Sequence, residues 1–359
     1  MAGIRKTSEN IRQFILRNVE HNPKNIATLT ARKYRISRQA VNKHIKRLVE
    51  QDELLAQGAT RNKHYSLKLL EKWEHAYILD EKLAEDAVWR ADISPFVTDL
   101  AENAIDIWRY GFTEMLNNAI DHSAGTKVHV EASKTAITTK IVIYDDGEGI
   151  FKKIQRELAL NDERHAVLEL AKGKLTTDPD NHTGEGIFFS ARMFDDFAIL
   201  SGGVRFSHVP NEMEVGLSES QKFQSGTSVF MMLSNDTKRT EKHVFDSFTS
   251  GDDYGFTKTV VPVRLAQYGE DKLVSRSQAK RLLARVEKFS TVIFDFDQVD
   301  SIGQAFADEI FRVFKTRQPE VELVDLNANK QVTQMIRRVL STGWRRRVSR
   351  HVSLPRKGA

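Results

Sequence analysis

A carboxylate followed by two glycines is the clearest chemical feature of this 359-residue sequence. Asp145 follows the β-branched run Thr139–Tyr144, which predicts a strand, and Gly147 and Gly149 come within the next four residues. A carboxylate at the end of a strand can accept a hydrogen bond from an exocyclic amine. Glycine backbone can also pass close to a flat ring, because it carries no side chain. The pattern predicts a site for an amine-bearing ring.

Two further glycine motifs lie downstream. One of them, called the second glycine motif after that of Asp145, precedes an expected helix at residues 188–194, so that glycine amides and a helix N-terminus would face one anion; its residues are Thr183, Gly184 and Gly186. The third motif, Gly226 with Thr227, opens another predicted strand. Each motif alone is more often a turn than a ligand site.

Upstream of these motifs, the run Phe112–His122 predicts a helix with one polar face. Glu114 and Asn118 lie four positions apart, so they sit on the same side of that helix about one turn from each other. Met115 and Leu116 belong to its buried side. A Glu–Asn pair on a polar helix face is ordinary by itself.

Together, in this order and spacing, the four motifs resemble the GHKL (Bergerat-fold) ATPase family, and among its branches most closely the anti-sigma-factor serine kinases. The resemblance implies an α/β sandwich that binds ATP with Mg²⁺. It implies that Asn118 ligates Mg²⁺, that Asp145 reads the adenine amine and that Glu114 is the general base. It also implies that residues 151–183 form a mobile lid. The remaining implied ATP-binding residues are Gly147, Gly149, Thr183, Gly184, Gly186 and Thr227.

The N-terminal 70 residues predict two helices, a third basic helix after Ser37, and a hairpin around residues 58–62. This order resembles the winged helix-turn-helix domain. The resemblance implies double-stranded DNA as a partner, read in the major groove by side chains of the third helix. Those side chains are Arg38, Gln39, Asn42, Lys43 and Lys46. A protein-interaction module with a solvated basic face is the alternative.

The charge distribution agrees with a polyanionic partner for the N-terminal segment. Residues 1–70 carry a net charge of +10 and residues 326–359 carry +9, whereas residues 71–325 carry −14. A basic head and tail around an acidic middle indicate that different segments meet different partners.

The C-terminal segment alternates predicted strands and helices, as in a small α/β domain. The stretch Phe294–Gly303 resembles the STAS domain of anti-anti-sigma factors, in a divergent STAS-like form. The resemblance implies a phosphoacceptor at Ser301, although Ile302 stands where a small residue is common. The alternative is that Asp300 or Ser301 caps the following helix.

Composition places the chain among folded proteins with neither disulfides nor membrane spans. Cysteine is absent, and charges interrupt every apolar run, so we expect a cytoplasmic protein. The expected fold class is multidomain α+β and α/β. The expected domains are a winged helix-turn-helix (1–70), a helical connector (71–106), a GHKL ATP-binding domain (107–240), a STAS-like domain (250–345) and a basic tail (346–359).

The sequence therefore predicts an ATP-binding bacterial regulator that couples a GHKL nucleotide site to DNA binding. One version transfers phosphate to Ser301 of its own STAS-like domain. The other is an ATP-switched DNA-binding or protein-docking clamp, with slow hydrolysis and no phosphoprotein. The choice between kinase, ATPase and nucleotide sensor stays open, as do a homodimer and a protein partner of the STAS-like domain.

Overall fold

The computed structural model describes residues 2–175, 184–208, 215–217, 225–249, 255–267 and 272–349. The chain forms two compact units. The first comprises Met1–Gly147, Phe194–Ile199 and Thr227–Arg239, and the second comprises Glu148–Met193, Leu200–Gly226 and Thr240–Ala359. Within the described ranges, no helix has both the length and the apolarity needed to cross a membrane.

The first unit begins with three helices and an antiparallel hairpin, which confirms the elements predicted there. Ser37 starts the third helix, since its Oγ accepts a hydrogen bond from the Ala40 amide at 3.2 Å. A core of nine buried apolar residues, from Ile11 to Leu54, holds these elements together. The elements are α1 (Ala2–Asn18), α2 (Ile26–Tyr34), α3 (Arg38–Glu50), β1 (Leu54–Gln57) and β2 (His64–Leu67).

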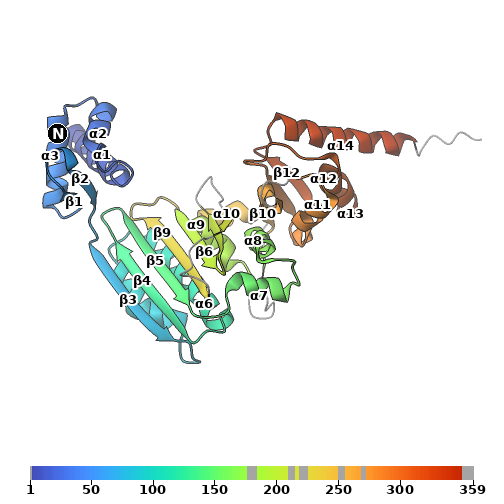
Figure 1. The fold of residues 1–359 in the computed structure, drawn as a ribbon, viewed down its shortest axis with the longest axis horizontal. Coiled ribbons are helices and arrows are strands. Elements are labelled where there is room, and N and C mark those ends of the chain that lie inside the picture. The colour runs from blue at the N-terminus through green and yellow to red at the C-terminus, as the bar shows by residue number, and fades with distance from the viewer. Residues whose placement is uncertain are drawn as a thin grey trace, which may run out of the picture. The chain divides into compact units, whose positions relative to one another are not determined.

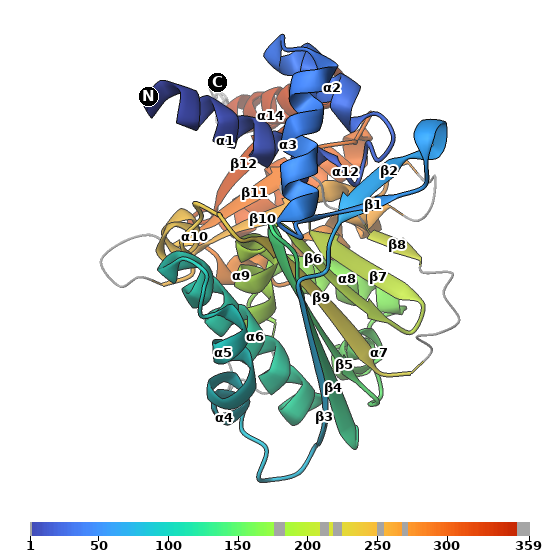
Figure 2. The same cartoon turned by 90° about the vertical axis from the view of Figure 1, so that its left-hand side faces the viewer.

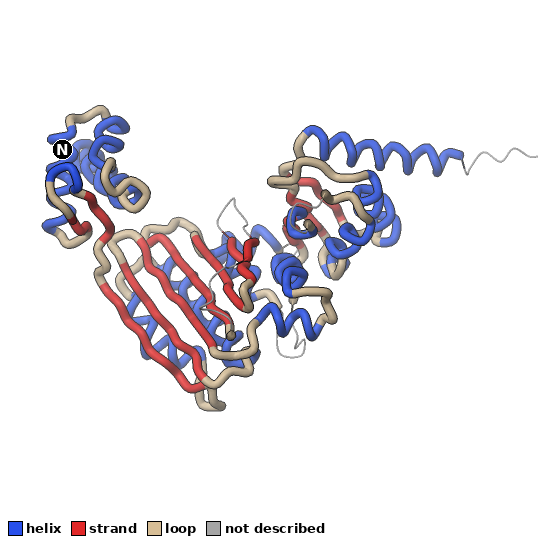
Figure 3. The backbone as a smooth tube through the Cα atoms, in the orientation of Figure 1, coloured by secondary structure: helices blue, strands red, loops and turns tan. Residues whose placement is uncertain are grey.

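A twisted sheet with helices on one face completes the first unit. Among its described residues, the strand order is β3-β4-β5-β9-β6, and the first three pairs are antiparallel. Figure 1 and Figure 3 show β3, β4, β5 and β9 lying side by side. The strands are β3 (Glu71–Ile78), β4 (Lys127–Lys134), β5 (Thr138–Asp145), β6 (Asp196–Ser201) and β9 (Thr227–Ser234).

Strand β3 corrects the predicted helical connector at residues 71–106. Its residues Glu71–Ile78 pair with β4 along their whole length instead of forming a helix. The reason is a period of two: Trp73, His75 and Tyr77 point to the helix-covered face of the sheet, while Lys72, Glu74 and Ala76 point to the other face. Helices follow only afterwards, as α4 (Glu85–Val88), a π-helical turn (Trp89–Ile93) and α5 (Ser94–Val97).

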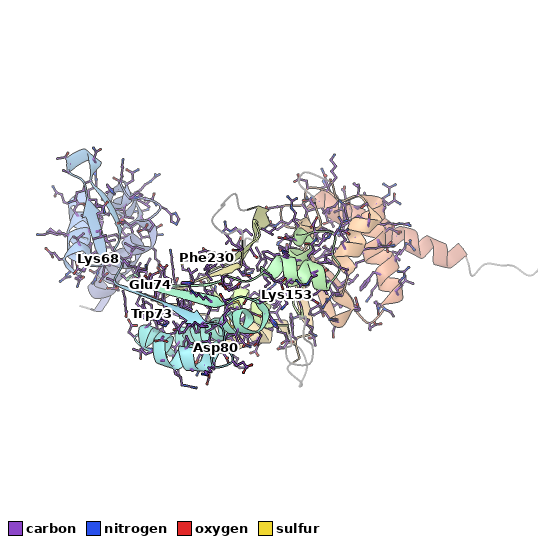
Figure 4. All side chains as sticks on the ribbon, turned by 60° about the horizontal axis from the view of Figure 1, so that its bottom comes forward. Lys68, Trp73, Glu74, Asp80, Lys153 and Phe230 are labelled. Carbon is purple, nitrogen blue, oxygen red and sulfur yellow. The ribbon has the colours of Figure 1, made fainter. Side chains whose placement is uncertain are left out.

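Burial alternates along β4 and β5, because only one face of the sheet is covered. Helix α6 (Glu102–His122) packs on β5 and β9, and α4 and α5 pack on α6 (Figure 2). On the opposite face, Glu74 and Phe230 lie in one row across the four strands, whereas Trp73 points to the helices (Figure 4).

The second unit combines several helices with a parallel sheet. Its strands β10, β11 and β12 are adjacent in that order and parallel, as the alternation of strands and helices predicts. Before them come α7 (Ile150–Glu157), α8 (Glu163–Lys172), α9 (Gly186–Met193), β7 (Val204–His208), β8 (Val215–Leu217) and α10 (Glu241–Phe248). The parallel region contains β10 (Lys258–Pro262), α11 (Arg276–Leu283), β11 (Thr291–Asp295), α12 (Gln304–Asp308), a π-helical segment (Glu309–Phe314), α13 (Lys315–Arg317), β12 (Glu322–Leu326) and α14 (Lys330–Ser349).

Two predicted segments differ from the structure in extent. The expected lid at 151–183 contains two regular helices, α7 and α8, and residues 176–183 lie outside the described part of the chain. The expected basic tail at 346–359 begins inside α14, which continues to Ser349; residues 350–359 are also outside the described part.

Candidate functional site

Helix α6 places Glu114 and Asn118 on one partly exposed face, as predicted. Its other face is apolar and buried, with Trp108 and Phe112 fully enclosed. Both polar side chains keep intermediate exposure while the neighbours Met115 and Leu116 are buried. The amphipathic pattern thus fixes which side of α6 presents the carboxylate and the amide.

Asp145, the last residue of β5, is buried and is held by two backbone amides. It is 5% exposed, and its Oδ1 accepts hydrogen bonds from the Gly147 amide at 2.9 Å and the Thr227 amide at 3.2 Å. Because both bonds from described residues end on Oδ1, Oδ2 keeps its capacity to accept a bond from a ligand. Burial raises the pKa of the Asp145 carboxyl, and the two amides act in the opposite direction.

Asp146, the next residue, has a different role. Its Oδ1 accepts hydrogen bonds from the amides of Thr126 (2.6 Å) and Lys127 (2.9 Å), and its Oδ2 accepts one from the Thr126 hydroxyl at 2.7 Å. These bonds, led by that from the Lys127 amide, lower the pKa of Asp146 to about 2. Asp146 therefore fixes the start of β4, and Asp145 alone of this pair remains available for recognition.

Gly147 packs directly on the backbone of Ser123, which follows α6. A Cβ at position 147 would clash with the Ser123 carbonyl, so only glycine fits. Ser123 is 7% exposed and is a site residue that sequence reasoning missed. Its one sequence signal is its position one residue after the helix that carries Asn118.

Gly149 and Gly184, in the second unit, occupy conformations that other residues rarely adopt. Gly149 has φ +92° and Gly184 has φ +71°, while Gly186 is the first residue of α9. A Cβ at Gly149 would lie 2.5 Å from the Ser201 hydroxyl oxygen. Gly226, with φ +74°, precedes Thr227. Thr183, a predicted ligand residue, lies outside the described part of the chain.

The predicted residues are thus distributed over both units. Within the first unit, hydrogen bonds bring Asp145, Gly147 and Thr227 together, and α6 supplies Glu114 and Asn118. The second unit carries the other three described residues, Gly149, Gly184 and Gly186.

The donor set of the first unit fits ATP better than a metal ion alone. The described residues contain no group of three or more histidine, cysteine, aspartate or glutamate side chains that could hold a metal. A single amide oxygen, that of Asn118, suits Mg²⁺ whose other ligands are phosphate oxygens and waters. The Asp145 carboxylate suits an exocyclic amine on a flat ring.

The exposed face of α3 carries every predicted DNA contact. Val41, Ile45 and Leu48 are buried against the core of the N-terminal helices. The five predicted contact residues are all exposed, namely Arg38, Gln39, Asn42, Lys43 and Lys46. Basic and amide side chains therefore share one solvent-facing surface.

The predicted helix cap by Asp300 or Ser301 is wrong. Helix α12 starts at Gln304, its N-cap is Gly303, and no side chain caps it. Gly303 is held in place by its own amide, which donates to the Leu273 carbonyl at 2.7 Å, and a Cβ would meet Val274. Ser301 is half-buried in the loop two residues before that N-cap.

Two segments of the chain match known protein families. Residues 82–206 match the "Histidine kinase-like ATPase domain", which implies ATP binding, typically with Mg²⁺. This match begins ahead of the expected domain start at 107. Residues 278–333 match the "STAS-like domain of unknown function (DUF4325)". No curated protein matches the chain. Residues 82–206 are therefore similar to histidine kinase-like ATPase domains, and residues 278–333 are similar to STAS-like domains.

Proposed function

We propose that this protein is an ATP-binding regulator in which the nucleotide site controls DNA binding. The observation that carries the nucleotide part is the geometry of Asp145. The amides of Gly147 and Thr227 orient its carboxylate, while Oδ2 keeps its accepting capacity for the adenine amine. The match of residues 82–206 to ATPase domains supports the same assignment.

Helix α6 supplies the groups for chemistry at the γ-phosphate. Mg²⁺ bound with ATP would neutralise charge that develops on the transferring phosphoryl group. Asn118 is the residue to hold the ion through its amide oxygen. Glu114, one helical turn earlier, is the general base that takes a proton from the attacking water or hydroxyl.

The N-terminal helices are proposed to bind double-stranded DNA. Support comes from the exposed face of α3, where basic and amide side chains gather without burial. Such side chains can contact phosphates and base edges when a helix enters the major groove. The net charge of +10 over residues 1–70 adds long-range attraction to a polyanion.

The fate of the γ-phosphate distinguishes two versions of this regulator. In a kinase, the Ser301 oxygen bonds to the γ-phosphorus as the bond to the bridging oxygen breaks, Glu114 takes the hydroxyl proton, and ADP leaves. In a switch, water takes the place of Ser301. The position of Ser301, two residues before the Gly303 N-cap, favours the switch, because no helix N-terminus begins at the serine to stabilise a phosphate.

Incubation with Mg²⁺ and γ-labelled ATP tests this function. The switch predicts free labelled phosphate, no labelled chain, and no effect of Ser301→Ala. The kinase version predicts a labelled chain instead, and the label should disappear in Ser301→Ala. The control is Ser277→Ala, which changes an exposed serine of α11 and should keep the label. If the experiment yields no labelled chain and no free phosphate, both versions are refuted and a nucleotide sensor is left. A homodimer and a protein bound to the STAS-like domain are further proposed partners of either version.

A further inference from the structure

Lys172, the last residue of α8, is buried with all of its donors used. The residue is 1% exposed, and its Nζ donates to Glu169 Oε1 at 2.7 Å. The same nitrogen donates to the carbonyls of Arg281 (3.0 Å) and Ala284 (2.8 Å), which end helix α11. An ammonium group that caps a helix C-terminus is favoured by the helix dipole. Lys172 thus joins α8 to the C-terminal α/β region.

The backbone of Lys172 is held by the same region. Its carbonyl accepts a hydrogen bond of 2.6 Å from the hydroxyl of Thr259, a fully buried residue of β10. The guanidinium of Arg285 lies 3.9 Å from the buried Glu169 carboxylate, so Glu169 forms ion pairs with both Lys172 and Arg285. Buried ion pairs hold a geometry tightly, because breaking one leaves an uncompensated charge.

The next two residues are fixed by aromatic rings. Gly173 has φ +78°, and a Cβ there would lie 2.8 Å from ring carbons of Phe188 and Phe256. Lys174 places its Nζ over the Phe256 and Phe289 rings, at 5.5 and 4.9 Å from their centroids. The same Nζ donates to the Lys288 carbonyl at 3.2 Å. Both residues therefore contact Phe256, and Lys174 also contacts Lys288 and Phe289.

The second glycine motif contacts Leu175, the residue after Lys174. The Leu175 amide donates to the Gly184 carbonyl at 3.1 Å. A Cβ on Gly184 would clash with the Leu175 backbone, so the backbones of these two residues lie in close contact. We call Lys172–Leu175 the anchor segment.

We propose that the STAS-like domain positions the second glycine motif of the nucleotide site through the anchor segment, with Lys172 as the positioning residue. The inference rests on the proposed function, because it takes that motif as the phosphate-binding part of the site. ATP affinity then depends on residues that lie outside the glycine motif itself. The dependence is reciprocal, so phosphate binding stabilises the contact between α8 and the STAS-like domain.

Comparing ATP with adenosine separates positioning from general structural support. In the full-length protein, Lys172→Met should weaken ATP binding by about tenfold or more while adenosine affinity changes less than about twofold. The double change Lys172→Met with Glu169→Leu avoids an unpaired buried carboxylate and should show the same selective loss. Thr259→Val, which removes one hydroxyl, should cause a smaller loss of ATP affinity and also leave adenosine affinity unchanged. Lys280→Met, an exposed lysine on α11, is the matched control and should bind both ligands normally.

Amide hydrogen exchange of the nucleotide-free protein provides a readout that needs no ligand. The Leu175 amide should exchange faster in Lys172→Met and Thr259→Val than in wild type, while amides of β4 and β5 exchange as before. Unchanged ATP affinity together with unchanged Leu175 exchange would overturn the inference. An equal loss of ATP and adenosine affinity would also overturn it, in favour of a general structural role. Wild-type protein that binds no ATP would instead refute the proposed function, and Leu175 exchange would still test the anchor.

Discussion

Replacing Glu114 by alanine is expected to lower the rate of γ-phosphate release from ATP by about 10²- to 10⁴-fold. ATP affinity should stay within about threefold of wild type, because Glu114 acts on the attacking group in the transition state rather than on bound ATP. The residue lies on the partly exposed face of α6, one turn before Asn118. Release of labelled phosphate and equilibrium binding of ATP are the two measurements.

The matched control is Glu102→Ala, an exposed glutamate in the first turn of the same helix. This change removes the same charge from α6 far from Asn118, so turnover should be unchanged. Wild-type turnover by Glu114→Ala would contradict the assignment of the base. Turnover lost equally in both variants would show that the helix, rather than the Glu114 carboxylate, had been disturbed.

Replacing Asp145 by asparagine is expected to weaken ATP binding by about 10- to 100-fold and to remove the preference for ATP over GTP. A hydrogen bond to a charged group contributes about 1.5–3 kcal/mol, which corresponds to that range. The asparagine oxygen can still accept the bonds from Gly147 and Thr227, but its amide would then face the adenine amine, donor against donor.

Asp146→Asn is the matched control for Asp145, since it removes the neighbouring charge. Its bonds to Thr126 and Lys127 fix β4 rather than a ligand. The variant should lose stability, measured by thermal unfolding, and retain the preference for ATP. The roles assigned to these carboxylates would be contradicted if Asp145→Asn kept the preference for ATP over GTP. They would also be contradicted if Asp146→Asn lost it.

The raised pKa of Asp145 adds a pH dependence with a defined sign. Recognition of the adenine amine requires the carboxylate, so affinity is complete above the pKa of Asp145 and falls as the pH drops through it. Because burial raises that pKa above the ordinary value of 3.8, the loss begins at a higher pH than for an exposed aspartate. The ratio of wild-type to Asp145→Asn affinity isolates this effect from titration of ATP itself.

The spacing of apolar residues along the sequence predicts the helices and strands that bury one face. The helix before Asn118 and the strand before Asp145 carry clear apolar periods of 3.6 and 2, and both form as expected. The strand at Glu71–Ile78 was missed because it lies at the sheet edge, where charged residues hide the alternation of Trp73, His75 and Tyr77.

Contacts between distant residues could not be predicted from local patterns. Lys172 ends helix α8, which is buried along its last two turns. Two of its three hydrogen-bond partners are backbone carbonyls more than a hundred residues later, which leave no mark in the sequence. Asp145 and Asp146 are adjacent carboxylates with opposite environments, a difference set by the turn at Thr126 and by burial. The alternative in which Asp300 or Ser301 caps α12 is wrong, because the N-cap is Gly303 and no side chain caps the helix.

The measurement that tests the central claim most directly is the affinity for duplex DNA with and without ATP and Mg²⁺. A mixed-sequence duplex titrated into full-length protein should bind with an affinity that ATP changes by about fivefold or more, as expected for two coupled sites. Asp145→Asn should bind DNA without this response, and Arg38→Ala with Lys43→Ala and Lys46→Ala should bind weakly under both conditions. Equal DNA affinity with and without ATP, in protein shown to bind both ligands, would contradict the account.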